Sequence, residues 1–239
     1  MIKASDRLIV ALDLNALVDA EGLVESLSPA VKIFKVGSQL FTVGGPTIID
    51  MIQRKGCKVF LDLKLHDIPS TVARTSRLIA KYGVYMFNLH TLGGLEMMRQ
   101  ARSAVDEEAR GSGKDPPIII GVTILTSIEE ATLRTDLGSK RGLKEEILHL
   151  AGLGKEAGLD GVVASPKEVR AIRKAMGKDF IIITPGVRPE GWPSEDQKRV
   201  ATPREAIDCG ADYIVVGRPV IKAEDPIQAA QKIIEEIQD

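Results

Sequence analysis

Four charged side chains recur near the ends of the first three apolar, β-branched runs of the sequence. Asp13 follows the first run, Lys35 lies within the second, and Asp62 and Lys64 alternate along the third. Residues two apart on a strand share a face, so Asp62 and Lys64 are predicted to point the same way. Burying charges costs several kcal/mol per ion unless they are paired. A lone ion pair could be purely structural, but four alternating charges on three adjacent strands favour a functional site, because perturbed ionisable groups concentrate at such sites.

A second candidate site follows the last two apolar runs. Thr184–Pro189 and Val215–Pro219 each contain a glycine followed by an arginine, which gives Arg188 in the first segment and Gly217 and Arg218 in the second. Glycine lets a backbone approach a ligand closely, and arginine can bind phosphate through two donors. We therefore predict a phosphate site, in preference to turn glycines beside solvated arginines. The polar loop 188–199 could close over the phosphate through Gln197, but an ordinary exposed loop explains its composition equally well.

These residues need a scaffold that brings strand ends together. Apolar runs typical of buried parallel strands alternate with amphipathic segments along the chain. The strand candidates are Leu8–Asp13, Val31–Gly37, Lys58–Lys64, Tyr85–His90, Ile118–Leu125, Gly161–Ser165, Phe180–Val187 and Asp212–Arg218. The clearest helix candidates are Ser70–Tyr82, Leu92–Arg110, Lys144–Ala157 and Pro226–Gln238, with an extra short helix around Ile128–Arg134.

Eight strand–helix units in 239 residues predict the α/β class and a single (β/α)8 TIM barrel, with residues 1–239 forming one catalytic domain. In such a barrel the chemistry lies at the carboxyl ends of the strands, where both candidate sites fall. The alternative fold is a doubly wound open α/β sheet. No Gly-x-Gly-x-x-Gly follows the first run, which weakens a dinucleotide-binding version of that alternative.

Composition narrows the function further. The 32 basic and 33 acidic residues give a net charge of −1, which argues against a nucleic-acid binder. The sequence contains neither an apolar run long enough for a membrane span nor a secretory signal, so we expect a cytoplasmic protein without membrane contact. Cys57 and Cys209 match no metal spacing, and three scattered histidines predict no metal site. Among the histidines, His66 is expected to be a neutral, hydrogen-bonded structural residue.

The motifs resemble those of the bacterial orotidine 5′-phosphate decarboxylase family over nearly the whole chain. They are Ala11-Leu12-Asp13, Phe34–Gly37, Phe60–Thr71, Thr184–Pro189, Asp196–Arg199 and Val216–Pro219. The Asp-x-Lys-x-x-Asp stretch that begins at Asp62 and precedes Ile68 is the most specific; Ser70, where Asn is usual, is a mild departure. The resemblance implies an enzyme that converts orotidine 5′-monophosphate to UMP and CO₂ in de novo pyrimidine biosynthesis, without metal or organic cofactor.

The resemblance also implies a role for each matching residue. Lys64 would donate the proton to C6, with Asp62, Lys35 and Asp67 as its charged partners. Asp67 would reach the neighbouring subunit's site in a homodimer, together with Ile68 and Thr71. The remaining contacts would fall to residues that bind ribose, pyrimidine and phosphate: Asp13 and Lys35 for the ribose, Thr126 for the pyrimidine, and Arg188, Gln197, Gly217 and Arg218 for the phosphate.

Two other functions remain open from the sequence. Mg²⁺-dependent sugar-phosphate decarboxylases and synthases of the same superfamily share the third-strand pattern, but they carry an acidic metal ligand near the end of the second strand, where this chain has Lys35. A non-catalytic barrel that binds a phosphorylated metabolite would need Arg218 and the 188–199 loop. It would not need the alternating Asp/Lys array.

Overall fold

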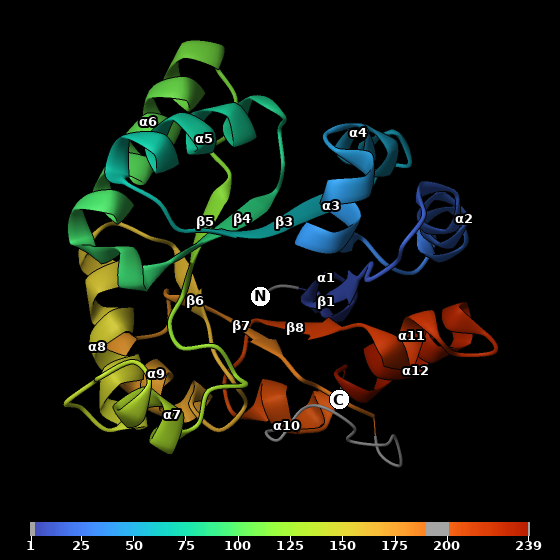
Figure 1. Cartoon of the computed structure of the whole chain (residues 1–239). Helices are drawn as coiled ribbons and strands as arrows, with labels where there is room; N and C mark the ends of the chain where they lie inside the picture. The colour runs from blue at the N-terminus through green and yellow to red at the C-terminus, as the bar shows by residue number, and fades with distance from the viewer. Residues whose placement is uncertain (1–2, 190–200, 239) are drawn as a thin grey trace.

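The eight predicted strands close into a parallel barrel in the order β1 to β8 (Figure 1). The structure is a computed structural model, and it describes residues 3–189 and 201–238. The strands are β1 (Leu8–Ala11), β2 (Ile33–Gly37), β3 (Lys58–Leu65), β4 (Met86–His90), β5 (Ile118–Val122), β6 (Gly161–Val163), β7 (Ile181–Pro185) and β8 (Tyr213–Val216). β8 pairs with β1, so no strand edge is left open. The predicted barrel is therefore confirmed, and the open-sheet alternative is wrong.

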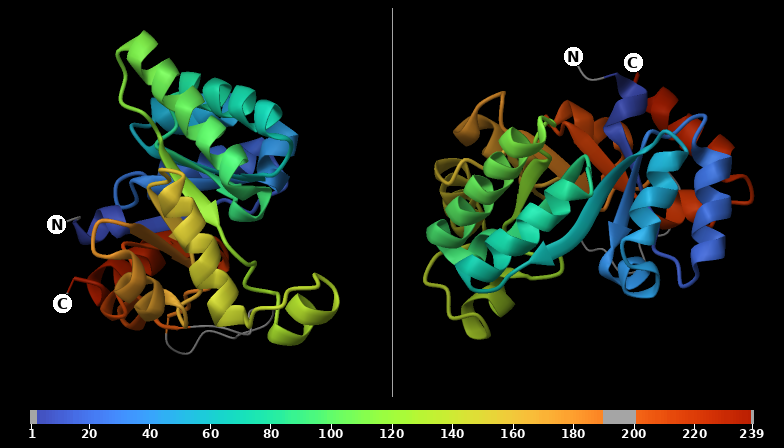
Figure 2. Two further views of the ribbon diagram at one scale, coloured as in Figure 1. Left: turned by 90° about the vertical axis from the view of Figure 1, so that its left-hand side faces the viewer. Right: turned by 90° about the horizontal axis from the view of Figure 1, so that it is seen from above.

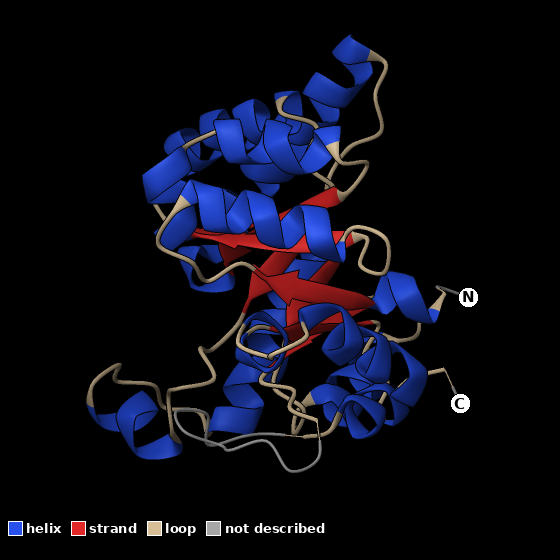
Figure 3. Ribbon diagram, turned by 90° about the vertical axis from the view of Figure 1, so that its right-hand side faces the viewer, coloured by secondary structure: helices blue, strands red, loops and turns tan. Residues whose placement is uncertain are grey.

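Helices form a ring outside the strands, as Figure 3 shows. They are α1 (Ala4–Arg7), α2 (Leu17–Leu27), α3 (Ser38–Gly44), α4 (Thr47–Arg54), α5 (Pro69–Lys81), α6 (Gly94–Ser112), α7 (Glu130–Thr135), α8 (Leu143–Glu156), α9 (Val169–Met176), α10 (Pro203–Asp208), α11 (Arg218–Ile221) and α12 (Pro226–Glu236), with a 3-10 turn at Thr91–Gly93. The predicted helices match α5, α6, α8 and α12 to within a few residues. The extra helix predicted between the fifth and sixth strands is α7, which stands off from the end of the barrel opposite the chain termini (Figure 2).

Alternation along the strands divides the apolar residues into two layers. The inner layer fills the barrel with strand residues such as Ile9, Ile33, Phe60 and Met86. The outer, larger layer lies between the barrel and the helices and includes the buried Leu61. The partly buried Leu63 and Leu65 of β3 pack against this layer. Side chains two residues after an inner-layer position therefore face the barrel interior, which is where Lys35, Asp62 and Asn88 project.

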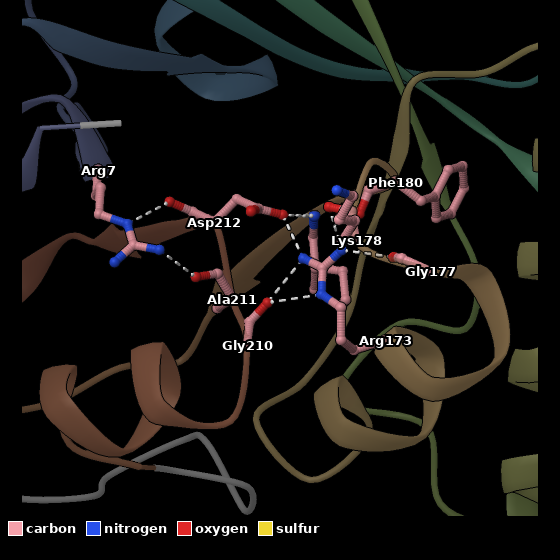
Figure 4. Close-up of polar contacts among 9 residues, drawn as sticks. Arg7, Arg173, Gly177, Lys178, Phe180, Gly210, Ala211 and Asp212 are labelled. Carbon is pink, nitrogen blue, oxygen red and sulfur yellow. Dashed lines mark hydrogen bonds and ion pairs between the residues drawn. The ribbon is translucent and has the colours of Figure 1, made fainter. Parts of the chain in front are cut away.

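An ionic contact ties the seventh and eighth units together at the amino-terminal end of the barrel (Figure 4). Asp212 precedes β8, and one of its carboxylate oxygens accepts the Ile182 backbone N–H at 2.7 Å and Arg173 Nη2 at 2.6 Å. Arg173 of α9 also donates to the Gly210 carbonyl at 2.8 Å, and Arg7 donates to the Asp212 carbonyl at 3.2 Å. A charge-assisted cluster of this kind stabilises the end of a barrel that lies away from the chemistry.

The same arrangement recurs two units earlier. Asp160 precedes β6 and accepts the backbone N–H of Ile119 in β5 at 2.7 Å, and Arg102 of α6 completes the contact at 3.1 Å. Strand pairs β5–β6 and β7–β8 are thus each fixed by an aspartate, a strand N–H and an arginine from a neighbouring helix. These contacts lie at the amino-terminal end of the barrel, so the carboxyl ends of the strands remain available for a binding site.

Among the helices of the described residues, none combines the length and the apolar character that crossing a membrane requires.

Candidate active site

A cavity of about 550 Å³ opens at the carboxyl ends of the strands and receives side chains from all eight of them. Its charged and polar lining residues are Asp13, Lys35, Asp62, Lys64, Asn88, Thr126, Arg188, Arg218 and Lys222. Apolar residues such as Ile124, Val163, Ile183 and Val215 form the rest of the lining. A cavity of this size with a few convergent polar groups is typical of a small-molecule site.

The four charges predicted from the first three strands meet in this cavity as one chain of ion pairs. Lys35 Nζ lies 3.3 Å from Asp13 Oδ1 and 3.2 Å from Asp62 Oδ2. Lys64 Nζ lies 2.6 Å from the other carboxylate oxygen of Asp62. Positive and negative groups therefore alternate from Asp13 through Lys35 and Asp62 to Lys64. The predicted juxtaposition of these four side chains is confirmed, whereas their roles remain predictions.

Burial and charge act in opposite directions on the two central members of this chain. Burial alone lowers the pKa of Lys35, but the carboxylates of Asp62 and Asp13 outweigh it and leave the pKa raised. Burial alone raises the pKa of Asp62, but Lys35, Lys64 and the hydrogen bond from Asn88 more than offset it and leave the pKa lowered. Both groups are therefore ionised near neutral pH, and the site holds fixed charges in a partly dehydrated pocket.

The loops after β7 and β8 bring the predicted anion-binding residues to the cavity. Arg188 is only 9% exposed and follows β7, and Gly217 and Arg218 follow β8 at the start of α11. A Cβ at position 217 would lie 3.4 Å from Asp13 Oδ2, which is ordinary van der Waals contact, so Gly217 lies beside Asp13. Thr126 lines the cavity after β5. Gln197, predicted to contact the phosphate, lies outside the described residues.

Three predicted site residues lie outside their own chain's cavity. Asp67, Ile68 and Thr71 form the turn after β3 and the first part of α5, and Asp67 accepts the backbone N–H of Ile68 at 2.6 Å. Ile68 is 63% exposed although it is apolar. This position is compatible with residues that complete a neighbouring subunit's site, which is the role the resemblance implies.

Asn88 is a site residue that the sequence did not single out. It lies in the middle of β4, is 1% exposed, and its amide contacts both Asp62 and the backbone of Lys64. The available signal was a polar residue in a short apolar strand. The expectation for His66 was wrong: its side chain is exposed, and its ring lies 5.3 Å from that of His90 rather than within a hydrogen-bonded core.

Within residues 3–189 and 201–238, no group of three or more His, Cys, Asp or Glu side chains is arranged to hold a metal ion. Cys57 and Cys209 are free thiols. The expected independence from metal remains a prediction.

Comparisons with known proteins agree with this geometry. Residues 6–233 match the model of the "Orotidine 5'-phosphate decarboxylase / HUMPS family". An orotidine 5′-phosphate decarboxylase from Moorella thermoacetica is 49% identical, covering 98% of this chain and 93% of the relative, and one from Syntrophotalea carbinolica is 51% identical, covering 99% and 97%. Among solved structures, the crystal structure of the Lactobacillus acidophilus orotidine 5′-phosphate decarboxylase is 35% identical with a TM-score of 0.87, covering 98% of this chain and all of the other. With a family match over most of its length and relatives near 50% identity, the chain belongs to the orotidine 5′-phosphate decarboxylase / HUMPS family.

Proposed function

We propose that residues 1–239 form one catalytic domain that decarboxylates orotidine 5′-monophosphate to UMP and CO₂ in de novo pyrimidine biosynthesis, with Lys64 as the proton donor. The observation that carries the proposal is the contact of Lys64 Nζ with Asp62 at 2.6 Å inside the cavity, with Lys35 on the far side of the same carboxylate. An ammonium group held in this way is directed at a ligand that fills the cavity.

The reaction needs a cation at one carbon atom. When the bond between C6 and the carboxylate breaks, its electron pair stays on C6, where no resonance delocalises it. The Lys64 ammonium stabilises the developing charge and then transfers its proton to C6, which leaves a neutral amine that solvent reprotonates. Preorganised charges act strongly here because Asp62 and Lys35 are already fixed by their mutual contacts before a substrate binds.

The other side chains of the cavity suit the remaining parts of the substrate. Arg188, Gly217 and Arg218 lie together on one wall and would hold the phosphate, with Gln197 as a further contact. Asp13 and Lys35 would bind ribose hydroxyls, and Thr126 would contact the pyrimidine. Binding energy from the phosphate, remote from C6, can then contribute to stabilising the transition state.

A homodimer with shared sites accounts for exposed apolar residues along α5 and at its ends. Ile68, Thr71, Thr75, Leu78 and Tyr82 follow one another at intervals of three and four residues, so they form one stripe along the helix. Ile68 and Leu78 are 63% and 54% exposed. An apolar stripe beside Asp67 suits a twofold contact in which each subunit supplies Asp67, Ile68 and Thr71 to the site of the other.

The function is tested by following the loss of orotidine 5′-monophosphate absorbance in the presence of excess EDTA. We expect full turnover, with UMP as product, because the cavity presents Lys35 where a divalent cation would need an acidic ligand. Activity that disappears with EDTA and returns with Mg²⁺ would favour the metal-dependent members of the superfamily. Binding of UMP without any turnover would favour a non-catalytic metabolite-binding barrel.

A second prediction concerns the phosphate wall. Arg218→Ala should lower kcat/KM for orotidine 5′-monophosphate by about 10- to 100-fold, the usual effect of losing a charge-assisted hydrogen bond. It should leave the much slower decarboxylation of orotidine, which has no phosphate, nearly unchanged. Steady-state assays with both substrates make the comparison. An equal loss on the two substrates would exclude a phosphate contact for Arg218.

A further inference from the structure

The pairing between β3 and β4 is broken at one place, beside the ion-pair chain. Leu61 pairs with Phe87 and Leu65 pairs with Leu89, so three residues of β3, Asp62 to Lys64, lie opposite the single residue Asn88 of β4. Such a bulge leaves backbone groups without their ladder partners and redirects the side chains that it carries. The side chain redirected here is that of Lys64, whereas Asp62 still follows the alternation of the strand.

The bulge puts Lys64 in an unusual backbone conformation. Its φ is +52°, and within the part of the chain that the structure describes it is the only residue other than glycine with a positive φ. A side chain with a Cβ pays roughly 1–2 kcal/mol for this left-handed conformation, so the surroundings must hold it in place. At a site of chemistry, such strain persists only where neighbouring contacts over-determine the geometry.

The Asn88 side chain makes both contacts that hold the bulge. Its Oδ1 accepts the backbone N–H of Lys64 at 2.8 Å, and its Nδ2 donates to Asp62 Oδ1 at 2.6 Å. The orientation of the amide follows from its partners, since a backbone N–H can only donate and an ionised carboxylate can only accept. One side chain thus replaces the missing ladder contact of the proton donor and also orients its counter-ion.

These two bonds fix the arrangement of charge around Asp62. Its Oδ1 receives Lys64 Nζ and Asn88 Nδ2, and its Oδ2 faces Lys35. Without Asn88 the carboxylate could rotate toward Lys35, and Lys64 could relax to an ordinary strand conformation that moves its ammonium group. A displacement of about 1 Å at a reacting group can cost on the order of 100-fold in rate.

We infer that Asn88 is a positioning residue for the proton transfer: its neutral amide locks the left-handed backbone of Lys64 and the carboxylate of Asp62 in one geometry. The inference rests on the proposed function. Asn88 also lines the cavity, but its amide is engaged by Asp62 and Lys64. Its loss should therefore act on kcat much more than on substrate or product binding.

The decisive variant is Asn88→Asp, which keeps the shape of the side chain. As a protonated acid, the new side chain can accept from Lys64 N–H and donate to Asp62, as asparagine does. Once ionised, it opposes Asp62 and adds a second negative charge beside Lys64. The charged or titratable groups near position 88 are Asp62 and Lys64 on β3, Lys35 on β2 and His90 on β4; the facing residue on β5 is Ile120.

The two enzymes are compared by the ratio of their kcat values, Asn88→Asp over unmodified, from about pH 5 to 9. We expect this ratio to fall about tenfold per pH unit once the new carboxylic acid ionises. Asn88→Ala should lose about 100-fold in kcat at all pH values, while UMP affinity changes by no more than about threefold. Circular dichroism at each pH shows whether either variant unfolds. Activity of Asn88→Asp at low pH would show in addition that its fold is intact.

Ser76→Ala provides the matched control. Ser76 is a fully buried polar residue of α5 that lies outside the cavity, and its hydroxyl has no hydrogen-bond partner among the described residues. Its removal should leave kcat unchanged. The role of Asn88 would be overturned if the pH profile of Asn88→Asp ran parallel to that of the unmodified enzyme, or if Asn88→Ala kept full activity. In both cases the unmodified enzyme would still decarboxylate its substrate, so the proposed function would be unaffected. An unmodified enzyme that does not turn over would instead refute the proposed function itself.

Discussion

Lys64→Ala should fold normally and lose turnover by on the order of 10⁴-fold, since in the proposed mechanism this one side chain supplies both the charge that stabilises the carbanion and the proton that quenches it. The fold should survive because Asp62 keeps its contacts with Lys35 and Asn88, so no carboxylate is left buried without a partner. Single-turnover measurements of CO₂ release, with UMP binding measured in parallel, separate a chemical defect from a binding defect.

Lys58→Ala is the matched control for this variant. Lys58 begins the same strand at the opposite end of the barrel, where its ammonium group lies 4.3 Å from the centre of the Tyr85 ring. Its loss should cost at most about 1 kcal/mol of stability and leave kcat unaltered. If Lys64→Ala retained the activity of the unmodified enzyme, the proton would have to come from another group.

The prediction of the barrel succeeded where strand and helix periods are long and strongly apolar. Runs such as Ile118–Val122 contain no competing signal, and α5, α6, α8 and α12 carry clear amphipathic patterns. Short helices such as α3 and α10 were not specified, although the equally short α7 was, because six or seven residues seldom hold enough periodicity to be distinguished from a turn. Their positions depend on tertiary packing against the barrel.

The prediction of the site succeeded for residues whose placement depends on strand alternation alone. Lys35 and Asp62 follow inner-layer residues by two positions, and they face the cavity as that rule requires. Lys64 also reaches the cavity, but through a bulge in which simple alternation no longer holds. Asn88 was missed because the available signal, a polar residue in a short apolar strand, does not reveal its role, which arises from a register shift between β3 and β4.

The second prediction with a large effect tests the proposed homodimer with shared sites. Asp67→Ala should lower kcat by on the order of 100- to 1000-fold, because Lys64 in the site of the other subunit would lose a carboxylate partner. Mixed with Lys64→Ala under conditions that allow subunit exchange, it should regain about one quarter of the activity of the unmodified enzyme. Half of the randomly formed dimers are then mixed, and one of the two sites in each mixed dimer is intact. Activity measured against mixing ratio gives the result directly.

The matched control is a mixture of Lys64→Ala with Asp62→Ala. Lys64 and Asp62 lie 2.6 Å apart in one chain's cavity, so each subunit of a mixed dimer would carry one defective site and no intact site would form. Recovery with Asp67→Ala but not with Asp62→Ala would therefore identify Asp67 as the residue that crosses between subunits. Recovery with neither would place Asp67 with its own chain's cavity, and the exposed stripe of α5 would then need another explanation. The contrast depends on one geometric fact, that Asp62 lies inside the cavity of its own chain whereas Asp67, five residues later, lies outside it.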